Sequence, residues 1–216
     1  MTISQYGVAV LDNVQGYLQT VEKDSAKKML ELRSLAPDLV YELRYASTNN
    51  FMKKRMYPKN TSHTFLRAPA ARALAKVQRQ LMTTGYRLKI FDAYRPYGVT
   101  ISFWEPIKDE RYVANPAKGS GHNRGLAVDL TLIDIKTGQE VNMGTAYDSF
   151  TDTAHHSFTK NLPPEIARAR GILKETMEQN GFTAMESEWW HYNWPNDKNY
   201  EVMDIPFRKL QNAVKN

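Results

Sequence analysis

Two stretches of the chain repeat apolar residues at the spacing of a helix face. Residues 68–85 and 163–181 each place an apolar residue at every third or fourth position, with polar residues between them. These residues are Ala70, Leu74, Val77 and Leu81 in the first stretch and Ile166, Ala169, Leu173 and Met177 in the second. The pattern predicts two amphipathic helices, and each apolar face needs another surface to pack against.

Four shorter runs have the composition of β-strands. They begin at Val40, Tyr86, Gly125 and Glu188 and read VYELRYA, YRLKIFDAY, GLAVDLTLI and EWWHYNW. Strands and helices do not alternate in a regular repeat, which disfavours a doubly wound parallel sheet. We therefore predict an α+β fold in which helices pack on a mainly antiparallel sheet. The 216 residues contain no internal repeat and no linker rich in glycine and serine, so a single domain is expected.

Composition narrows the range of functions. The net charge is +6 and the pI is near 9.3, but lysine and arginine are scattered, without a long basic run or a nucleic-acid-binding motif. The basic residues are therefore expected on a solvated surface, with no nucleic acid as partner. No apolar run approaches the roughly 20 residues that span a bilayer, and the first residues do not resemble a signal peptide. Cysteine is absent, so any metal needs nitrogen and oxygen ligands.

Residues 118–132, KGSGHNRGLAVDLTL, place a carboxylate in an otherwise apolar strand. The strand period of two sends Val128 and Leu130 to one face and Asp129 to the other. A carboxylate on a rigid strand needs a hydrogen-bond donor or a cation to offset its lost hydration. His122, seven residues earlier, is a candidate co-ligand of such a cation. From this segment alone, a solvent-exposed aspartate on the polar face of an edge strand explains the pattern as well.

The segment ESEWWHYNW, residues 186–194, carries a histidine among aromatic residues. Strand alternation groups Trp189, His191 and Asn193 on one face and Trp190, Tyr192 and Trp194 on the other. Glu188 points away from His191 in a strict strand, but a turn or bulge at the strand entry would let both reach one metal site. Such a pair suits hydrolysis, because neutral imidazole binds zinc and a free carboxylate takes a proton from water. The simpler explanation is a packed aromatic strand with an incidental histidine.

Arg95 lies in KIFDAYRPYG, residues 89–98, directly before Pro96. The proline biases Arg95 toward an extended backbone, at a point where a strand gives way to a new helix. From a rigid strand end, a guanidinium can stabilise the negative charge that develops on a carbonyl oxygen attacked by water. A structural ion pair with Asp92 or a contact with a helix C-terminus explains the same residue.

Taken together, SGHNRGLAVD, EWWH and DAYRP resemble the zinc-dependent D-alanyl-D-alanine dipeptidases, the family that includes the dipeptidase of vancomycin resistance. A Ser-x-His-x(6)-Asp element followed by Glu-x-x-His is typical of the wider D,D-peptidase and Hedgehog-like fold. Tyr-Arg-Pro and LRYASTNNF are typical of the dipeptidase branch. The resemblance runs from about Asp38 to Trp194. It implies one zinc peptidase domain with a catalytic core at 38–194, an N-terminal extension at 1–37 and a C-terminal tail at 195–216.

The resemblance also implies the catalytic residues. One Zn²⁺ per chain would be bound by His122, Asp129 and His191, with a fourth position open for water or substrate, as in catalytic zinc sites. Glu188 is similar to the general base of the family. Arg95 is similar to the residue that polarises the scissile carbonyl and holds the tetrahedral intermediate.

The resemblance extends to the substrate pocket. Asp148, in the segment MGTAYDSF, matches the acidic residue that meets the free amine of the substrate in the family. Ser120, Tyr45 and Phe51 match positions that line the small pocket. Gly121 stands where larger residues are common in the family, which is expected to loosen the pocket slightly.

The function that this resemblance implies is hydrolysis of the dipeptide D-Ala-D-Ala by metal-activated water. A peptidoglycan stem-peptide carboxypeptidase or endopeptidase, and a zinc-containing binding module without catalysis, are the alternatives on the same fold. The basic pI and the unmatched N-terminal segment favour the periplasm or cell envelope over the cytoplasm, and the oligomeric state is not predicted. We expect His63, His155 and His156 to be structural or surface groups, because adjacent residues on a regular element point in different directions.

Overall fold

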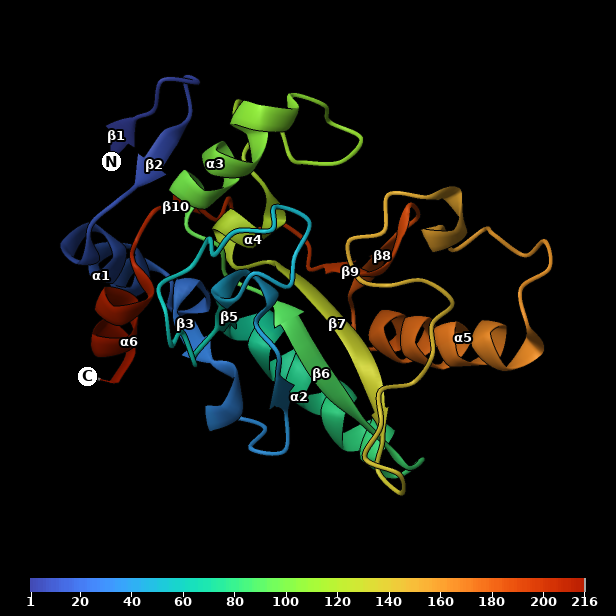
Figure 1. Cartoon of the computed structure of the whole chain (residues 1–216). Helices are drawn as coiled ribbons and strands as arrows, with labels where there is room; N and C mark the ends of the chain where they lie inside the picture. The colour runs from blue at the N-terminus through green and yellow to red at the C-terminus, as the bar shows by residue number, and fades with distance from the viewer. Residues whose placement is uncertain (216) are drawn as a thin grey trace.

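The computed structural model describes residues 1–215 and shows an α+β fold around a five-stranded sheet (Figure 1). The strand order is β4-β6-β7-β9-β8. The bounds are β4 Val40–Tyr41, β6 Tyr86–Asp92, β7 Ala127–Asp134, β8 Thr183–Met185 and β9 Glu188–Asn193. β4 and β6 are parallel, whereas the other three pairs of this sheet are antiparallel. The predicted fold class, with a mainly antiparallel central sheet, is confirmed.

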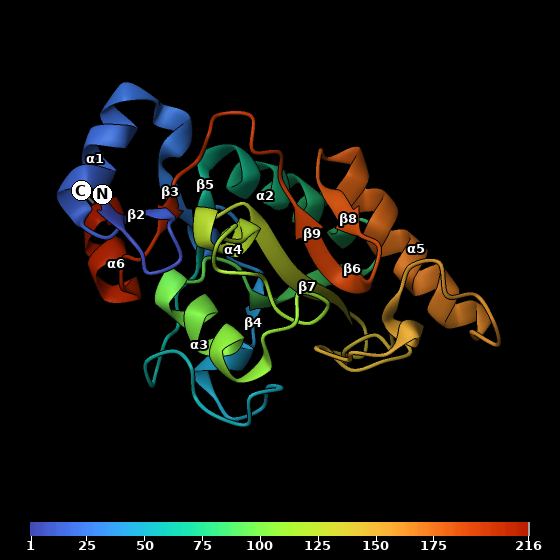
Figure 2. The same cartoon turned by 90° about the horizontal axis from the view of Figure 1, so that it is seen from above.

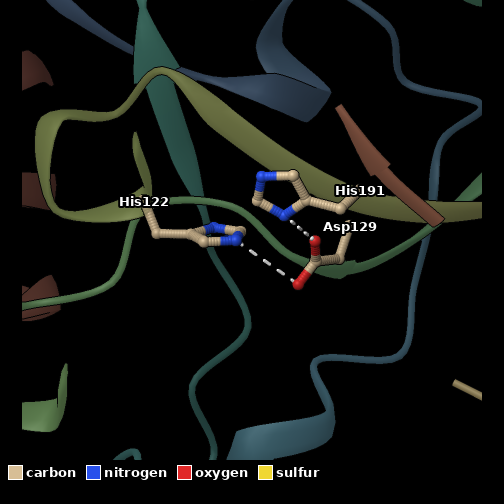
Figure 3. Close-up of side chains that lie close together, drawn as sticks. All are labelled: His122, Asp129 and His191. Carbon is tan, nitrogen blue, oxygen red and sulfur yellow. Dashed lines mark hydrogen bonds and ion pairs between the residues drawn. The ribbon is translucent and has the colours of Figure 1, made fainter. Parts of the chain in front are cut away.

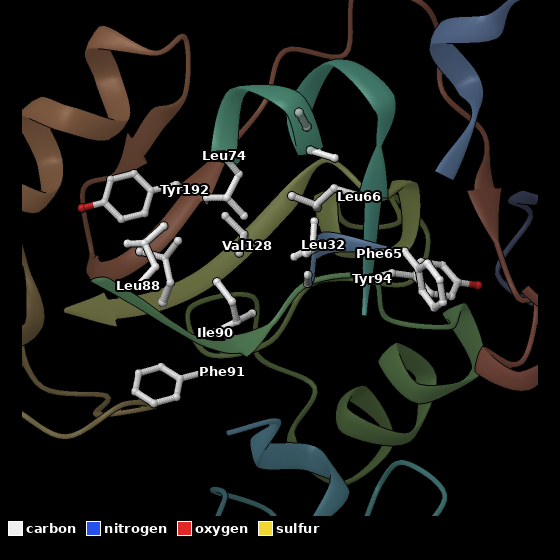
Figure 4. Close-up of a cluster of buried hydrophobic side chains, with 14 of the residues drawn as sticks. Leu32, Phe65, Leu66, Leu74, Leu88, Ile90, Phe91, Tyr94, Val128 and Tyr192 are labelled. Atoms are coloured by element: carbon white, nitrogen blue, oxygen red, sulfur yellow. The ribbon is translucent and has the colours of Figure 1, made fainter. Parts of the chain in front are cut away.

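Two helices cover one face of this sheet, namely α2 (Ala68–Met82) and α5 (Pro164–Gln179). All eight apolar residues whose spacing predicted these helices are buried. Figure 4 shows Leu74 of α2 over Val128 and Leu88 of the sheet, whereas Phe91 projects from the opposite side. The helix predictions are confirmed, because the apolar faces pack on the sheet as their spacing requires. None of the helices within residues 1–215 combines the length and the apolar character needed to cross a membrane.

The other face of the sheet carries α3 (Tyr97–Ile107), α4 (Gly121–Arg124) and irregular segments. Figure 2, seen from above, shows α3 on the side of the sheet away from α2. Single-turn 3-10 helices lie at Ser25–Lys27, Leu32–Ser34, Arg44–Ala46 and Asp152–Ala154. Asp129 projects toward this less regular face, because Val128 and Leu130 occupy the helix-covered side.

Two small sheets accompany the central sheet, and the first of them joins segments near the two chain ends. One has the order β1 (Thr2–Ile3), β2 (Ala9–Leu11) and β10 (Val202–Met203), and the other pairs β3 (Met29–Glu31) with β5 (Phe65–Arg67). Helix α1 (Val14–Lys23) packs against α6 (Phe207–Lys215). The buried Arg67 donates to the carbonyl oxygens of Lys27 at 2.6 Å, Arg124 at 2.8 Å and Glu201 at 3.3 Å. One guanidinium thus joins an N-terminal segment, α4 and a C-terminal segment.

The predicted strand that begins at Val40 is shorter than its sequence pattern indicates. Strand β4 ends at Tyr41, and a 3-10 turn follows at Arg44–Ala46. The side-chain amide of Asn50 donates to the carbonyl oxygens of Ser47 at 2.8 Å and Lys54 at 2.9 Å, which holds the following loop compact. The turn buries the ring of Tyr45, so packing overrides the strand propensity of this segment.

Candidate active site

Three predicted metal ligands converge on the irregular face of the sheet. Asp129 of β7 and His191 of β9 are direct partners across neighbouring strands, and His122 comes from α4, just before β7. Figure 3 shows both imidazole rings turned toward the Asp129 carboxylate. His191 Nδ1 lies 2.9 Å from Asp129 Oδ1, and His122 Nε2 lies 3.4 Å from Asp129 Oδ2. One ligand atom from each residue lies within 4.8 Å of the other two, a grouping compatible with a single metal ion.

Each histidine is oriented by a hydrogen bond on its outer nitrogen. His122 Nδ1 donates to the carbonyl oxygen of Ala93 at 2.7 Å, and His191 Nε2 donates to Asn193 Oδ1 at 3.2 Å. The remaining nitrogens, Nε2 of His122 and Nδ1 of His191, therefore face Asp129. His191 Nδ1 forms a hydrogen bond with Asp129 Oδ1 at 2.9 Å, and a bound metal ion would take the place of the proton between them. Metal-ligating histidines have this arrangement of partners, so the residues fit a bound cation.

The pKa values of the cluster reflect the contacts between the histidines and Asp129. Asp129 has only 3% of its surface exposed. Burial alone would raise the pKa of Asp129. The charge of His122 and the hydrogen bonds to both histidines lower it by a larger amount, so the pKa lies well below the usual value. Burial lowers the pKa of His191, but the hydrogen bond to Asp129 and its charge raise it above the usual value. β7 is a central strand, so the interpretation of Asp129 as a solvent-exposed residue on an edge strand is wrong.

The short helix α4 fixes where His122 and Ser120 lie. The Ser120 side chain accepts from the backbone nitrogen of Asn123 at 3.3 Å, and the Asn123 side chain accepts from the Ser120 backbone at 3.0 Å. This reciprocal pair is a capping box. Gly125 ends the helix at φ +69°, a conformation that favours glycine. His122 is therefore held on a well-capped turn, and Ser120 lines the cavity beside the metal cluster.

Glu188 reaches the cluster because of a large bulge in β9. Ala184 of β8 pairs with Tyr192, but the next residue, Met185, pairs with Glu188, which leaves residues 189–191 without partners in β8. Glu188 Oε2 lies 3.9 Å from His191 Nδ1. Burial raises the pKa of Glu188, and the charge of Asp129 adds to the effect. The sequence analysis required a bulge near the start of this strand for Glu188 and His191 to approach one site, and the structure has that bulge.

Because of this bulge, the predicted alternation of side chains along the aromatic strand is wrong. Trp190 was expected on the face opposite His191, yet both residues line the cavity. Trp189 and Trp190 are each 1% exposed, so consecutive tryptophans are buried on the two sides of the strand. Strict alternation fails here because the bulge adds unpaired residues and turns the chain between Glu188 and His191.

Arg95 pairs with Asp92, one of the interpretations that the sequence left open, and it also lines the cavity. Its Nε and Nη2 donate to Asp92 Oδ2 at 3.0 and 2.8 Å, and Nη2 lies 4.0 Å from Asp129 Oδ2. The guanidinium carbon lies 5.2 Å from the ring centre of Tyr45 and 4.9 Å from that of Phe103. Within residues 1–215, Nη1 has no hydrogen-bond partner. Arg95 is thus held by a buried carboxylate while one end of its guanidinium remains available in the cavity that it lines.

Asp148, Tyr45 and Phe51 line the same cavity, which has a volume of about 290 Å³. Tyr45 donates to the Asp148 carboxylate, with its hydroxyl 3.2 and 3.3 Å from the two oxygens. Loss of hydration raises the pKa of Asp148 well above its usual value, and the charge of Asp129 adds to the effect. Asp148 has φ +60°, which is uncommon for a residue other than glycine and is often found at functional positions. The structure places all nine predicted site residues around one cavity.

Several supporting residues were not singled out from the sequence. Tyr147 donates to Asp129 Oδ2 at 2.9 Å, and its hydroxyl lies 3.1 Å from that of Tyr45. Each hydroxyl has one proton, so Tyr147 stabilises the Asp129 carboxylate and Tyr45 stabilises that of Asp148. Tyr57 donates to Asp92 Oδ1 at 2.6 Å and so helps to hold the partner of Arg95. In the sequence, only Tyr147 could have been noticed, because it directly precedes Asp148. Tyr57 is far from Asp92 in the sequence, and the two meet only in the folded chain.

The remaining histidines lie outside the metal cluster formed within residues 1–215. His63 Nδ1 lies 3.8 Å from Glu31 Oε1, with 42% of the His63 side chain exposed. His156 packs against the ring of Tyr192, and burial together with the charge of Lys174 lowers its pKa to about 4. These contacts agree with structural or surface roles.

Comparison with known proteins points to one family. Residues 25–211 match the M15 peptidase family described as D-ala-D-ala dipeptidase. A D-alanyl-D-alanine dipeptidase of Escherichia coli (strain K12) is 34% identical over 180 residues, which cover 83% of this chain and 91% of the relative. One from Enterococcus faecalis is 30% identical over 170 residues, covering 70% of this chain and 84% of the relative. The solved LdcB LD-carboxypeptidase matches with a TM-score of 0.44 and 18% identity over 87% of this chain and 78% of that chain.

The family match extends beyond the stretch that carried the motif resemblance on both sides. It begins within the predicted N-terminal extension and ends within the predicted tail. The resemblance drawn from three short motifs is confirmed, since the family match spans residues 25–211 and a 34% identical relative is covered over 91% of its length. This chain belongs to the D-ala-D-ala dipeptidase family of M15 peptidases.

Proposed function

We propose that this protein hydrolyses the dipeptide D-Ala-D-Ala and that it binds one Zn²⁺ per chain through His122, Asp129 and His191. Two imidazoles and one carboxylate are a common ligand set of catalytic zinc sites, and three protein ligands leave a position for water or substrate. The absence of cysteine and the orientation of both histidines support a cation held by nitrogen and oxygen. The names of the relatives support the substrate.

Zn²⁺ in such a site lowers the pKa of a bound water and polarises a carbonyl group. Glu188, 3.9 Å from His191, takes the proton from the attacking water and later gives it to the leaving amine. Arg95 donates to the carbonyl oxygen as negative charge develops on it, from an orientation that Asp92 holds. This chemistry needs no covalent intermediate.

The observation that carries the choice of a dipeptide is the carboxylate of Asp148. It lines the cavity, and within residues 1–215 no lysine, arginine or histidine forms an ion pair with it. A carboxylate with little hydration is unfavourable unless a cation or several donors compensate. The ammonium group of a free dipeptide supplies that charge. A longer peptide has an uncharged amide at the same position, which leaves Asp148 unpaired.

The size of the cavity agrees with a small substrate. Its volume of about 290 Å³ is near the lower limit of the roughly 300–1,000 Å³ that is usual for small-molecule sites. Aromatic rings enclose it on one side, since Phe51 packs against Phe103 at 5.1 Å and against Phe150 at 5.4 Å between ring centres. A peptidoglycan stem requires a cleft that continues past the first residue.

A blocked substrate tests this proposal. We expect N-acetyl-D-Ala-D-Ala to be hydrolysed at least about 10²-fold more slowly than D-Ala-D-Ala in kcat/KM, because acetylation removes the ammonium and adds bulk. Asp148→Asn should reduce the difference in kcat/KM between the two substrates, mainly by slowing hydrolysis of the free dipeptide. Asp152→Asn, an exposed carboxylate on the same segment, is the matched control and should leave the gap unchanged. Comparable rates on the free and blocked dipeptides would reject the dipeptidase and favour a peptidoglycan carboxypeptidase.

Arg95→Lys tests the role of the guanidinium. Lysine keeps a positive charge beside the buried Asp92, so the folded state avoids an unpaired carboxylate, but it cannot donate from the same position. We expect kcat to fall about 10²–10³-fold, which is usual for the loss of one donor to a developing oxyanion. Zinc content and melting temperature report whether the site and fold persist. A kcat near that of the wild type with zinc bound would show that Arg95 is only structural.

A further inference from the structure

Gly121 and Asn193 lie against each other beside the metal cluster. A Cβ atom built on Gly121 would lie 2.7 Å from Asn193 Oδ1 and 2.9 Å from the Cβ of Ala127. Both distances are shorter than real Cβ contacts, so a larger residue at 121 requires a shift of its neighbours. The expectation that Gly121 loosens the pocket is therefore wrong, because the Asn193 side chain fills the space that glycine leaves.

The Asn193 side chain has one hydrogen bond within residues 1–215, and it involves a predicted metal ligand. Its Oδ1 accepts from His191 Nε2 at 3.2 Å. When Nε2 donates to Asn193, Nδ1, which faces Asp129 at 2.9 Å, is the nitrogen that binds a metal ion once its own proton is released. The other ligand, His122, has its tautomer set by a backbone carbonyl instead. Backbone partners are independent of side-chain identity, so His191 is the ligand whose orientation depends on a replaceable residue.

We propose that Asn193 is a positioning residue for the metal centre, and that Gly121 is required because it leaves room for the Asn193 side chain to accept from His191. The strand geometry supports this role. Asn193 of β9 and Ala127 of β7 are direct partners, and Asn193 follows His191 by two residues on the same strand. The amide oxygen therefore lies between α4, which carries His122, and the ring of His191. Partners of this kind typically change metal affinity about 10–100-fold when they are removed.

The inference rests on the proposed metal centre and is independent of the substrate. Its experiment measures zinc affinity by competition with a chromophoric chelator, together with the melting temperature of the metal-free protein. We expect Asn193→Leu, which is similar in size but accepts no hydrogen bond, to weaken zinc binding about 10–100-fold. Asn193→Asp keeps the acceptor and should bind zinc at least as tightly as the wild type. A space-filling role alone predicts that both variants behave alike.

A double-mutant cycle tests the link to Gly121. Gly121→Ala should weaken zinc binding in the wild-type background, since the new Cβ displaces Asn193 Oδ1. In the Asn193→Ala background the same change should cost less, because only the contact with Ala127 remains. Gly171→Ala, within α5 and with its nearest neighbour 3.9 Å away, is the matched control and should leave zinc affinity unchanged.

The hydrogen bond between His191 and Asn193 gives a readout that does not require activity. In a ¹H–¹⁵N spectrum of the zinc-loaded protein, the Nε2–H proton of His191 should exchange slowly with water in the wild type and should lose this protection in Asn193→Leu. The proposal is overturned if Asn193→Leu binds zinc as the wild type does, or if Asn193→Asp falls as far as Asn193→Leu. Failure of the wild type to bind zinc would overturn it along with the metal centre. Slow hydrolysis of D-Ala-D-Ala with tight zinc binding would contradict only the proposed substrate.

Discussion

His122→Ala, Asp129→Ala and His191→Ala are each expected to remove zinc and dipeptidase activity together. The three side chains supply every protein ligand of the proposed centre, and two remaining ligands bind zinc too weakly to retain it at ordinary concentrations. The wild type should contain about one zinc per chain, and each variant should contain close to none, as measured by metal analysis after dialysis. A chelator should inactivate the wild type, and added zinc should restore it.

A histidine outside the cluster is the control for this result. His63 is partly exposed and lies near Glu31, outside the cluster, so His63→Ala should retain zinc and activity. Circular dichroism of the ligand variants shows whether they remain folded without metal. Full activity in a metal-free preparation of the wild type would contradict a metallopeptidase mechanism for this chain.

Glu188→Gln is expected to retain zinc and to lower kcat by about 10²–10⁴-fold, the usual contribution of a general base. Glutamine has nearly the same size as glutamate but cannot take a proton from water. Glu188 is not among the three clustered ligands, so zinc content should stay at the wild-type value. The measurement compares kcat for D-Ala-D-Ala with zinc content in the same preparation.

Glu186→Gln is the matched control for the general base. Glu186 lies two residues earlier, accepts from the Ser157 backbone nitrogen at 2.8 Å and does not line the catalytic cavity. Its replacement should leave kcat within a few-fold of the wild type. If Glu188→Gln with bound zinc turns over as fast as Glu186→Gln, the proton acceptor is a different group.

The first part of the metal-ligand motif could be recognised in the sequence because its residues are close along the chain. His122 and Asp129 are seven residues apart, on a capped turn and on the strand that follows it, so local structure alone brings them close. The alternation of apolar residues in β7 also indicated which face Asp129 takes. Apolar periodicity and helix capping depend on residues that are neighbours in the sequence. The approximate positions of His122 and Asp129 could therefore be predicted from the sequence.

The contacts of Arg95 depend on long-range pairing. The register of β6 against β7 shifts between Ile90 and Asp92, and this irregularity sets Asp92 opposite Asp129. Asp92 then holds Arg95 at the cavity. From the sequence, a catalytic arginine and an arginine paired with Asp92 were competing interpretations. The structure shows the ion pair with Asp92 and leaves Arg95 at the cavity, so the ion pair does not exclude the proposed catalytic role.

The sequence by itself determined the fold class, the two amphipathic helices, the family and nine of the residues that line the candidate site. These follow from residue spacing within single elements and from motifs that are contiguous in the chain. Only the tertiary structure decided how Glu188 meets His191, that Asp148 lies beside Tyr45, and that Asn193 occupies the space beside Gly121. The reason is physical: strand register, bulges and side-chain packing are set by partners distant in sequence, and period-two alternation carries no information about where pairing shifts.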